Sequence, residues 1–281
     1  MNGVLKEDER FYHYTTLESF ANIVKTGVLW ASHIGYLNDT SEQSLVSKLV
    51  SARIENRLHN PECTNRDRLI EIQKYLSSPL GNDVFVVSFS KDGGDRLSQW
   101  RGYSGSAGVS IGFNPTELSK RCGAFTRLYF QPPLGGVGAL LREVKYIKPN
   151  GDEESDRTVD SLLDMHIAVA GMESMLTPSE IFNRQLSFTA FDLKDAAFQE
   201  EQESRIVIFD FSVDSQLSFR ARKSLLVPYR EFSLGKEIWP LIAKVIVGPS
   251  PHKRETATAV KRMIGDARIS VVESQIPYRD W

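Results

Sequence analysis

The opening stretch FYHYTTLESFANIVKTGVLWAS, residues 11–32, contains one complete strand, helix and strand unit. The aromatic residues at 11–14 favour a β-strand, and Thr15 with Glu18 three positions later is typical of a capping box that begins a helix. Gly27 is placed to end that helix, and residues 28–31 favour a second strand. The apolar residues between them recur at the spacing of one helical face: Leu17, Phe20, Ile23 and Val24.

Predicted strands come in clusters separated by helices along the rest of the chain, without a regular alternation of strand and helix. Helices are expected at residues 66–76, 156–175, 179–194 and 255–264. Strands are expected at residues 84–89, 108–113, 205–211, 217–220, 225–227, 244–247 and 269–273. The Pro- and Gly-rich residues 131–138 predict a loop. The contiguous apolar residues 206–209 indicate that their strand is central.

This pattern favours an α+β fold with mixed or antiparallel sheets flanked by helices. We see no internal repeat, low-complexity tract or linker, so one domain over residues 1–281 is expected. Its core should include residues from several predicted elements: Phe20, Ile23, Leu29, Ile208 and Val245.

Composition excludes several classes of protein. The formal charge of −2, from 34 basic and 36 acidic residues, gives no global field toward nucleic acid or anionic lipid. Cys63 and Cys122 lack the spacing of a disulfide framework or a metal site. The N-terminus does not have the pattern of a signal peptide, and no apolar run reaches the ~18 residues of a membrane span. We therefore expect a cytoplasmic protein with no membrane partner and no bound metal.

Several well-known catalytic motifs are missing from the sequence. It contains no H-E-x-x-H, no G-x-x-x-x-G-K-[ST] and no G-x-G-x-x-G that opens a helix after a strand. The segment from Gly102 to Ser106 is close to a nucleophile elbow but lacks its final glycine.

Three other elements could bind a ligand. His13 lies between Tyr12 and Tyr14 on the first strand, so its imidazole should point to the opposite side from the two rings. It could face a cleft, or it could be a core histidine with its hydrogen bonds satisfied.

The second element combines strand-end hydroxyls with a later aromatic segment. Ser88 and Ser90 end a predicted strand, and Arg101 between Trp100 and Tyr103 could bind a phosphate while a ring stacks on a heterocycle. Alternatively, the two aromatic residues are the buried face of a helix.

The third element is the acidic run before the strand of residues 205–211. Glu201 and Glu203 would share one face of a strand, as carboxylates that stabilise a ribosyl cation would require. The alternative is a solvated acidic loop.

Eight short segments occur in an order that resembles one bacterial protein family: FYHYT, FANIVKTGVLWAS, LNDTSE, VVSFS, SQWRGYS, EEQESRIVIF, KVIVGP and SQIPYR. The family is domain of unknown function 2971, and the resemblance extends over residues 11–279. The layout is in turn similar to that of ADP-ribosyltransferases, which are split β-sandwiches.

The second resemblance implies a site for NAD and a role for each element. His13 would contact a ribose hydroxyl, with Tyr14 and Thr15 beside it. The strand from Ser88 to Ser90 would be the middle element of the site, and Trp100, Arg101 and Tyr103 would complete it. Glu203 would be the catalytic glutamate, and Glu201 would position the acceptor.

The resulting hypothesis is an enzyme that cleaves NAD and transfers ADP-ribose to a nucleic-acid or protein acceptor, in a toxin or phage-defence setting. Two alternatives stay open: a non-catalytic nucleotide or nucleic-acid binding module on the same fold, and a carboxylate-dependent hydrolase. The transferase hypothesis expects His13, Ser90 and Glu203 to converge on one cleft. It also expects Glu203→Ala to do little harm to folding.

Overall fold

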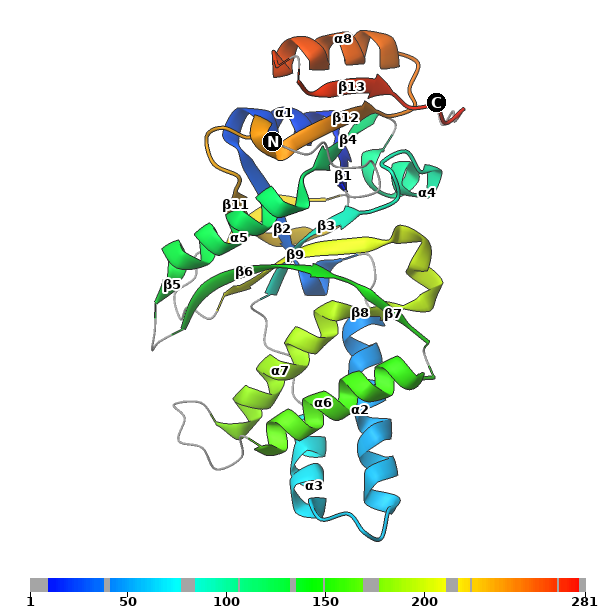
Figure 1. Cartoon of the computed structure of the whole chain (residues 1–281), viewed down its shortest axis with the longest axis vertical. Helices are drawn as coiled ribbons and strands as arrows, with labels where there is room; N and C mark the ends of the chain where they lie inside the picture. The colour runs from blue at the N-terminus through cyan, green and yellow to red at the C-terminus, as the bar shows by residue number, and fades with distance from the viewer. Residues whose placement is uncertain are drawn as a thin grey trace. The chain divides into compact units, whose positions relative to one another are not determined.

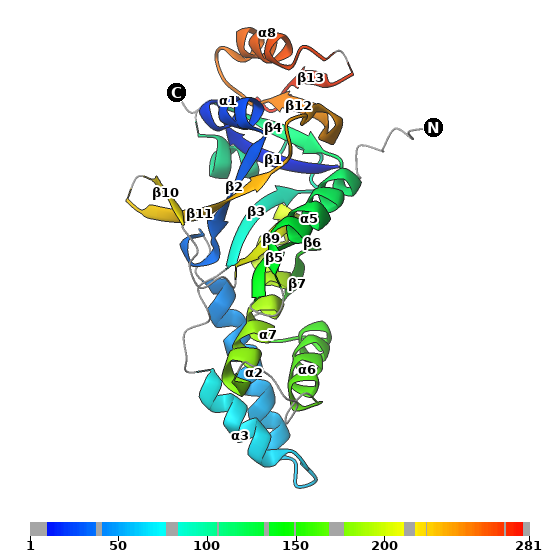
Figure 2. The ribbon, with the colours of Figure 1, turned by 90° about the vertical axis from the view of Figure 1, so that its left-hand side faces the viewer.

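The computed structural model describes residues 10–37, 41–76, 84–105, 107–131, 135–148, 150–168, 177–210, 217–222, 224–266 and 268–277. The chain divides into two compact units (Figures 1 and 2). The sheet unit comprises Met1–Ser32, Phe85–Glu143 and Glu200–Trp281, and the helical unit comprises His33–Val84 and Val144–Gln199. The expectation of one domain over residues 1–281 stays a prediction.

The sheet unit is built on one large sheet. Its strands are β1 (Phe11–Thr16), β2 (Val28–His33), β3 (Val84–Ser90), β4 (Gly108–Phe113), β5 (Phe130–Gln131), β6 (Gly135–Glu143), β9 (Glu203–Asp210), β10 (Ser218–Ala221), β11 (Leu226–Ser233), β12 (Ile242–Val247) and β13 (Ser270–Glu273). The main path runs β10-β11-β2-β3-β1-β4-β12-β13, while β9 pairs with both β3 and β6. The pairing is antiparallel at most edges and parallel between β12 and β13. The predicted α+β fold with a mixed, mostly antiparallel sheet is therefore confirmed.

Helices and short helical turns accompany this sheet. They are α1 (Leu17–Thr26), α4 (Leu97–Gln99), η3 (Trp100–Ser104), α5 (Pro115–Tyr129), η5 (Trp239–Leu241) and α8 (Lys253–Ile264). Helix α8 lies along β12 and β13 (Figure 1). No helix in the described residues is long and apolar enough to cross a membrane.

One side of the sheet, which we call the core face, carries the main hydrophobic core. Side chains that define it include Phe11, Leu29, Phe89, Ile111 and Ile206. Because side chains alternate along a strand, the residues between these lie on the opposite face. The five predicted core residues are all buried, which confirms that prediction: Phe20, Ile23, Leu29, Ile208 and Val245.

The opening unit forms as its sequence predicts, except at the helix start. Thr15 stays in β1 and is 8% exposed, while the Thr16 hydroxyl accepts a hydrogen bond from the Ser19 amide and caps α1. The predicted capping box at Thr15 is therefore wrong by one residue, because pairing with β4 keeps the chain extended. Gly27 ends α1 in the left-handed region at φ 66°, and a Cβ there would lie 2.3 Å from the Gly235 carbonyl oxygen.

The loop predicted at residues 131–138 is wrong in part. Gln131 belongs to β5, and β6 begins at Gly135 and pairs with β9 from Val137 onward. Residues 132–134 lie outside the described part of the chain. The strand expected at residues 205–211 is β9, whose eight residues are all buried and which has a neighbour on each side. Its predicted central position is confirmed.

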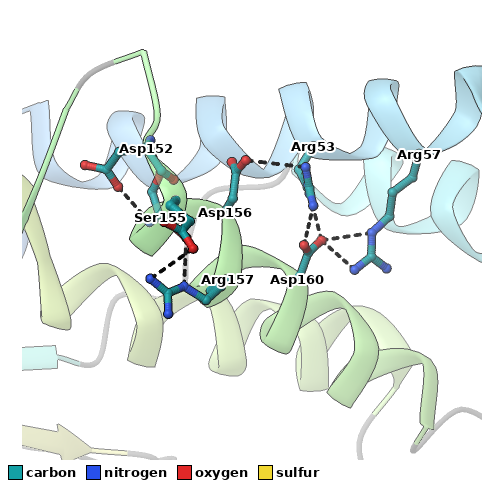
Figure 3. A network of polar contacts seen from close by, with 8 residues as sticks. Arg53, Arg57, Asp152, Ser155, Asp156, Arg157 and Asp160 are labelled. Carbon is teal, nitrogen blue, oxygen red and sulfur yellow. Dashed lines mark hydrogen bonds and ion pairs between the residues drawn. The ribbon is translucent and has the colours of Figure 1, made fainter.

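The helical unit has its own core. It comprises η2 (Ile34–Tyr36), α2 (Ser41–His59), α3 (Arg66–Tyr75), α6 (Glu153–Ala168), α7 (Pro178–Asp192) and η4 (Ala196–Glu201, whose last two residues belong to the sheet unit), with the parallel strands β7 (Lys145–Ile147) and β8 (Leu193–Asp195). Arg53 and Arg57 of α2 both donate to Asp160 of α6, through Nε at 2.8 and 3.0 Å (Figure 3). These ion pairs join two helices that also contribute side chains to the same apolar cluster, among them Val46 and Leu162.

Candidate functional site

His13 lies where β1 separates from β3. The register between these strands is the single pair Tyr12 and Ser90. Beyond it, the Nδ1 of His13 lies 3.0 Å from the Ser88 carbonyl oxygen, and its ring lies 5.7 Å from that of Phe89. The imidazole therefore takes the place of a backbone donor in the gap between two diverging strands.

This contact fixes the proton on the imidazole. A carbonyl oxygen only accepts, so Nδ1–H donates to Ser88 and Nε2 keeps a lone pair. Burial lowers the pKa of His13, and the nearby positive charge of Arg220 lowers it further, while the bond to Ser88 acts in the other direction. The half-buried His13 is thus a neutral hydrogen-bond acceptor near pH 7.

The middle strand joins the other two predicted elements. The Ser90 hydroxyl donates to the Glu201 carbonyl oxygen at 2.5 Å, and the Lys91 amide donates to the Gln202 carbonyl oxygen at 3.0 Å. Strand β3 thus pairs with β1 and also with β9. The segments of His13, Ser90 and Glu203 thus lie on three strands that pair with one another in turn. The expected convergence of the three side chains on one cleft stays a prediction.

The two glutamates differ in access. Glu203 is 5% exposed, and its two carboxylate oxygens each accept a 2.8 Å hydrogen bond from Arg205, from Nε and Nη2. Glu201 is half-buried. In the described part of the chain, no hydrogen bond or ion pair joins either carboxylate to His13. Glu203 in this state is a structural ion-pair partner with little area open to a substrate.

Tyr14 and Trp100 pack together on the opposite face of β1. Their ring centroids are 4.8 Å apart in an edge-on arrangement, within a small cluster that includes Tyr12. The Tyr14 hydroxyl donates to Asp92 at 3.0 Å and accepts from the Arg96 amide at 3.1 Å. Burial, followed by the charge of Asp92, raises the pKa of Tyr14. The prediction that His13 points away from Tyr12 and Tyr14 agrees with these contacts.

A neighbouring carboxylate, that of Asp95, joins Trp100 to the segment that follows β13. The Trp100 indole donates to Asp95 at 2.8 Å, and Asp95 also accepts from the Ser274 hydroxyl at 2.6 Å. Trp100 is buried, whereas Arg101 and Tyr103 are exposed. Trp100 therefore behaves as a core residue, and only part of the predicted aromatic segment is open to a ligand.

A further cluster, which the sequence did not single out, lies on the opposite face of three neighbouring strands, β2, β11 and β10. Figure 2 shows where these strands lie in the sheet. The Nη2 of Arg220 donates to the Ser32 hydroxyl at 2.5 Å, and its guanidinium carbon lies 5.9 Å from the centre of the Trp30 ring. Trp30 and Tyr229 rings are 4.7 Å apart. The only signal in the sequence was Trp30, an aromatic residue whose position in the strand alternates with those of the core residues beside it.

Comparisons with known proteins found one family model that matches part of the chain. The sequence model of the family described as "Protein of unknown function (DUF2971)" matches residues 99–206. The predicted resemblance to this family is confirmed over that stretch, which includes Trp100, Glu201 and Glu203. Searches of the curated proteins and of the solved structures gave no match. The described residues contain no group of three or more His, Cys, Asp or Glu side chains arranged to hold a metal.

Proposed function

We propose that the sheet unit binds a nucleotide, with NAD as the first candidate, at the gap between β1 and β3. The observation that carries this proposal is His13, whose Nδ1 is committed to Ser88 and whose Nε2 is a neutral acceptor. A ribose hydroxyl is a donor of matching type. Arg220, whose charge acts on His13, supplies a cation near the same gap.

Transfer of ADP-ribose is the finer proposal and needs a carboxylate near the ribose. Glu201 ends η4 and Glu203 begins β9, and a hydrogen bond from Ser90 joins this segment to β3. This proximity to β3 supports the finer proposal. The bidentate pair with Arg205 must open before Glu203 can stabilise a ribosyl cation. Glu201 is half-buried, so more of its side chain is open to a ligand than that of Glu203.

The non-catalytic binding module is the second candidate, and the Glu203–Arg205 pair favours it. A carboxylate whose two oxygens are held by charge-assisted bonds is already neutralised and poorly placed to meet new positive charge. The carboxylate-dependent hydrolase has no specific observation in its favour among the described residues.

The test measures binding and turnover separately. Titration calorimetry with NAD gives the affinity, and mass spectrometry of free nicotinamide, with and without DNA, RNA or bacterial lysate, gives cleavage. We expect His13→Ala to weaken NAD binding, and wild type that shows no NAD binding would refute the proposal.

Glutamine variants of the two glutamates then separate the candidates. If the chain transfers ADP-ribose, Glu203→Gln or Glu201→Gln should bind NAD normally and release nicotinamide roughly 10²-fold more slowly. If wild type binds NAD and releases no nicotinamide under any condition, the binding module is the better description. A thermal melt of each variant shows whether a loss of turnover is a loss of fold.

A further inference from the structure

Arg220 on β10 is a half-buried cation with few partners. Its single hydrogen bond to a described residue is the one from Nη2 to Ser32. Its Nε is buried and has no hydrogen-bond partner. Burial, and then repulsion from Arg222, lowers the pKa of Arg220. A guanidinium has five N–H donors, so most of its hydrogen-bonding capacity is unused in the described residues.

Two other arginines on strands of the sheet unit are paired with acids. Arg205 contacts Glu203, and Arg230 contacts Asp210. No described carboxylate lies within ion-pair distance of Arg220. Holding a cation in a partly desolvated place without an acid costs free energy, so a bound external anion would offset part of that cost.

The surroundings of Arg220 indicate what kind of anion fits. The planar fork of a guanidinium matches phosphate oxygens, and the Ser32 hydroxyl beside it is a second polar contact. Trp30 is 37% exposed, and it lies under the Arg220 guanidinium and beside Tyr229. A flat heterocycle can lie against the exposed surface of such a ring. The neutral Nε2 of His13 adds an acceptor for a sugar hydroxyl.

We propose that Arg220, Ser32 and Trp30 form the phosphate- and ring-binding part of a nucleotide site. The guanidinium binds a phosphate group, Ser32 orients the guanidinium, and Trp30 contacts the base. The inference rests on the proposed function only for the contribution of His13, because the cation and the ring make their contacts without it. The ligand's chemistry is shared by free nucleotides and by single-stranded nucleic acid.

The experiment uses the full chain and four probes: pyrophosphate, AMP, NAD and a ten-residue oligothymidylate. Calorimetry gives each affinity, and Trp fluorescence reports contact with the indole. The variants are Arg220→Gln, Arg220→Lys and Trp30→Ala. Arg262→Gln is the matched control, since it removes the same charge from an exposed position on α8 of the same unit.

We expect Arg220→Gln to lower the affinity for AMP and for pyrophosphate at least tenfold. Arg220→Lys should lower these affinities less, because lysine keeps the charge and lacks the planar fork of the guanidinium. Trp30→Ala should lower the affinity for AMP tenfold and change the affinity for pyrophosphate by less than twofold. The control variant should bind every probe with an affinity within twofold of that of wild type. An oligothymidylate that binds more tightly than AMP with the same dependence on Arg220 supports the site and assigns nucleic acid as the source.

Two results would overturn the inference. One is wild type that binds neither AMP nor pyrophosphate. The other is an Arg220→Gln variant that is folded in a thermal melt and binds both as wild type does. Binding of NAD that ignores Arg220 and Trp30 but needs His13 would keep the proposed function and reject this inference. Binding of AMP that needs Arg220, with no binding of NAD, would keep this inference and reject the proposal that the chain binds NAD.

Discussion

Removal of the Glu203 carboxylate should destabilise the sheet unit strongly, which reverses the expectation from the sequence. Glu203 and Arg205 have side-chain exposures of 6% and 1%, and two 2.8 Å bonds join them. Glu203→Ala leaves the buried guanidinium without the carboxylate that compensates its charge. Loss of one partner from a buried pair costs about 3–5 kcal/mol, or roughly 6–20 °C in Tm for a domain of this size.

The chain offers a probe that reports this unit by itself. All four tryptophans fall within the ranges of the sheet unit: Trp30, Trp100, Trp239 and Trp281. Urea unfolding followed by Trp fluorescence therefore measures the free energy of unfolding where Glu203 lies. Circular dichroism of the same samples shows whether the helical unit unfolds in the same transition.

Two further variants make the reasoning refutable. Glu231→Ala removes an exposed glutamate from β11 and should change the free energy of unfolding by less than about 0.5 kcal/mol. The double variant Glu203→Leu with Arg205→Met removes both charges and should recover most of the loss. A Glu203→Ala variant as stable as Glu231→Ala, or a double variant no better than the single one, would refute a structural role for the pair.

Three other predictions concern the rest of the chain. Thr177→Ala removes half of the capping box of α7 and should cost about 1 kcal/mol; hydrogen exchange in the first turn of α7 no faster than in wild type would contradict it. The hydrogen bond from Arg53, more than the nearby charges, lowers the pKa of Asp160, so its stabilisation is full above the unfolded pKa of about 3.9 and is lost as pH falls through the lower folded value. Acid unfolding followed by circular dichroism should show Asp160→Asn to be destabilised at pH 7 and the difference from wild type to shrink as the pH falls below the unfolded pKa; a constant difference between the two proteins would contradict this. Burial raises the pKa of Cys122 to about 12, so iodoacetamide at pH 8 should modify only Cys63 in the native protein and both thiols in urea, and native labelling of Cys122 in a peptide map would exclude its burial.

Sequence patterns predicted the elements better than their ends. The strand, helix and strand of residues 11–32 were found because their apolar spacing and Gly27 are local signals. The start of α1 was misplaced by one residue, because only pairing with β4 shows that Thr15 stays extended. The Gly-rich start of β6 was taken for a loop, because its strand state depends on the ladder with β9, 70 residues further along the chain.

The Arg220 cluster could not be found in this way. Ser32 and Arg220 are 188 positions apart, and their contact depends on β2 and β10 both flanking β11. Strand order is a property of the whole sheet, and no local pattern predicts it. By contrast, the resemblance gave a pairing to look for: the Ser90 hydroxyl does donate to the Glu201 carbonyl oxygen, while the convergence of His13, Ser90 and Glu203 on one cleft stays a prediction.

The charge partner of a strand arginine can sometimes be predicted from the sequence. Residues i and i+2 share a face, so the run from Glu203 to Arg205 already contained a same-face pair that competes with a catalytic role. Around Arg220, the same positions hold Ser218 and Arg222, so its own strand offers no acid. The rule does not extend to Arg230, whose partner Asp210 comes from β9. An arginine without a same-face acid is therefore only a candidate for ligand binding until the neighbouring strands are known, and for Arg220 the described neighbours supply a hydroxyl and an aromatic ring.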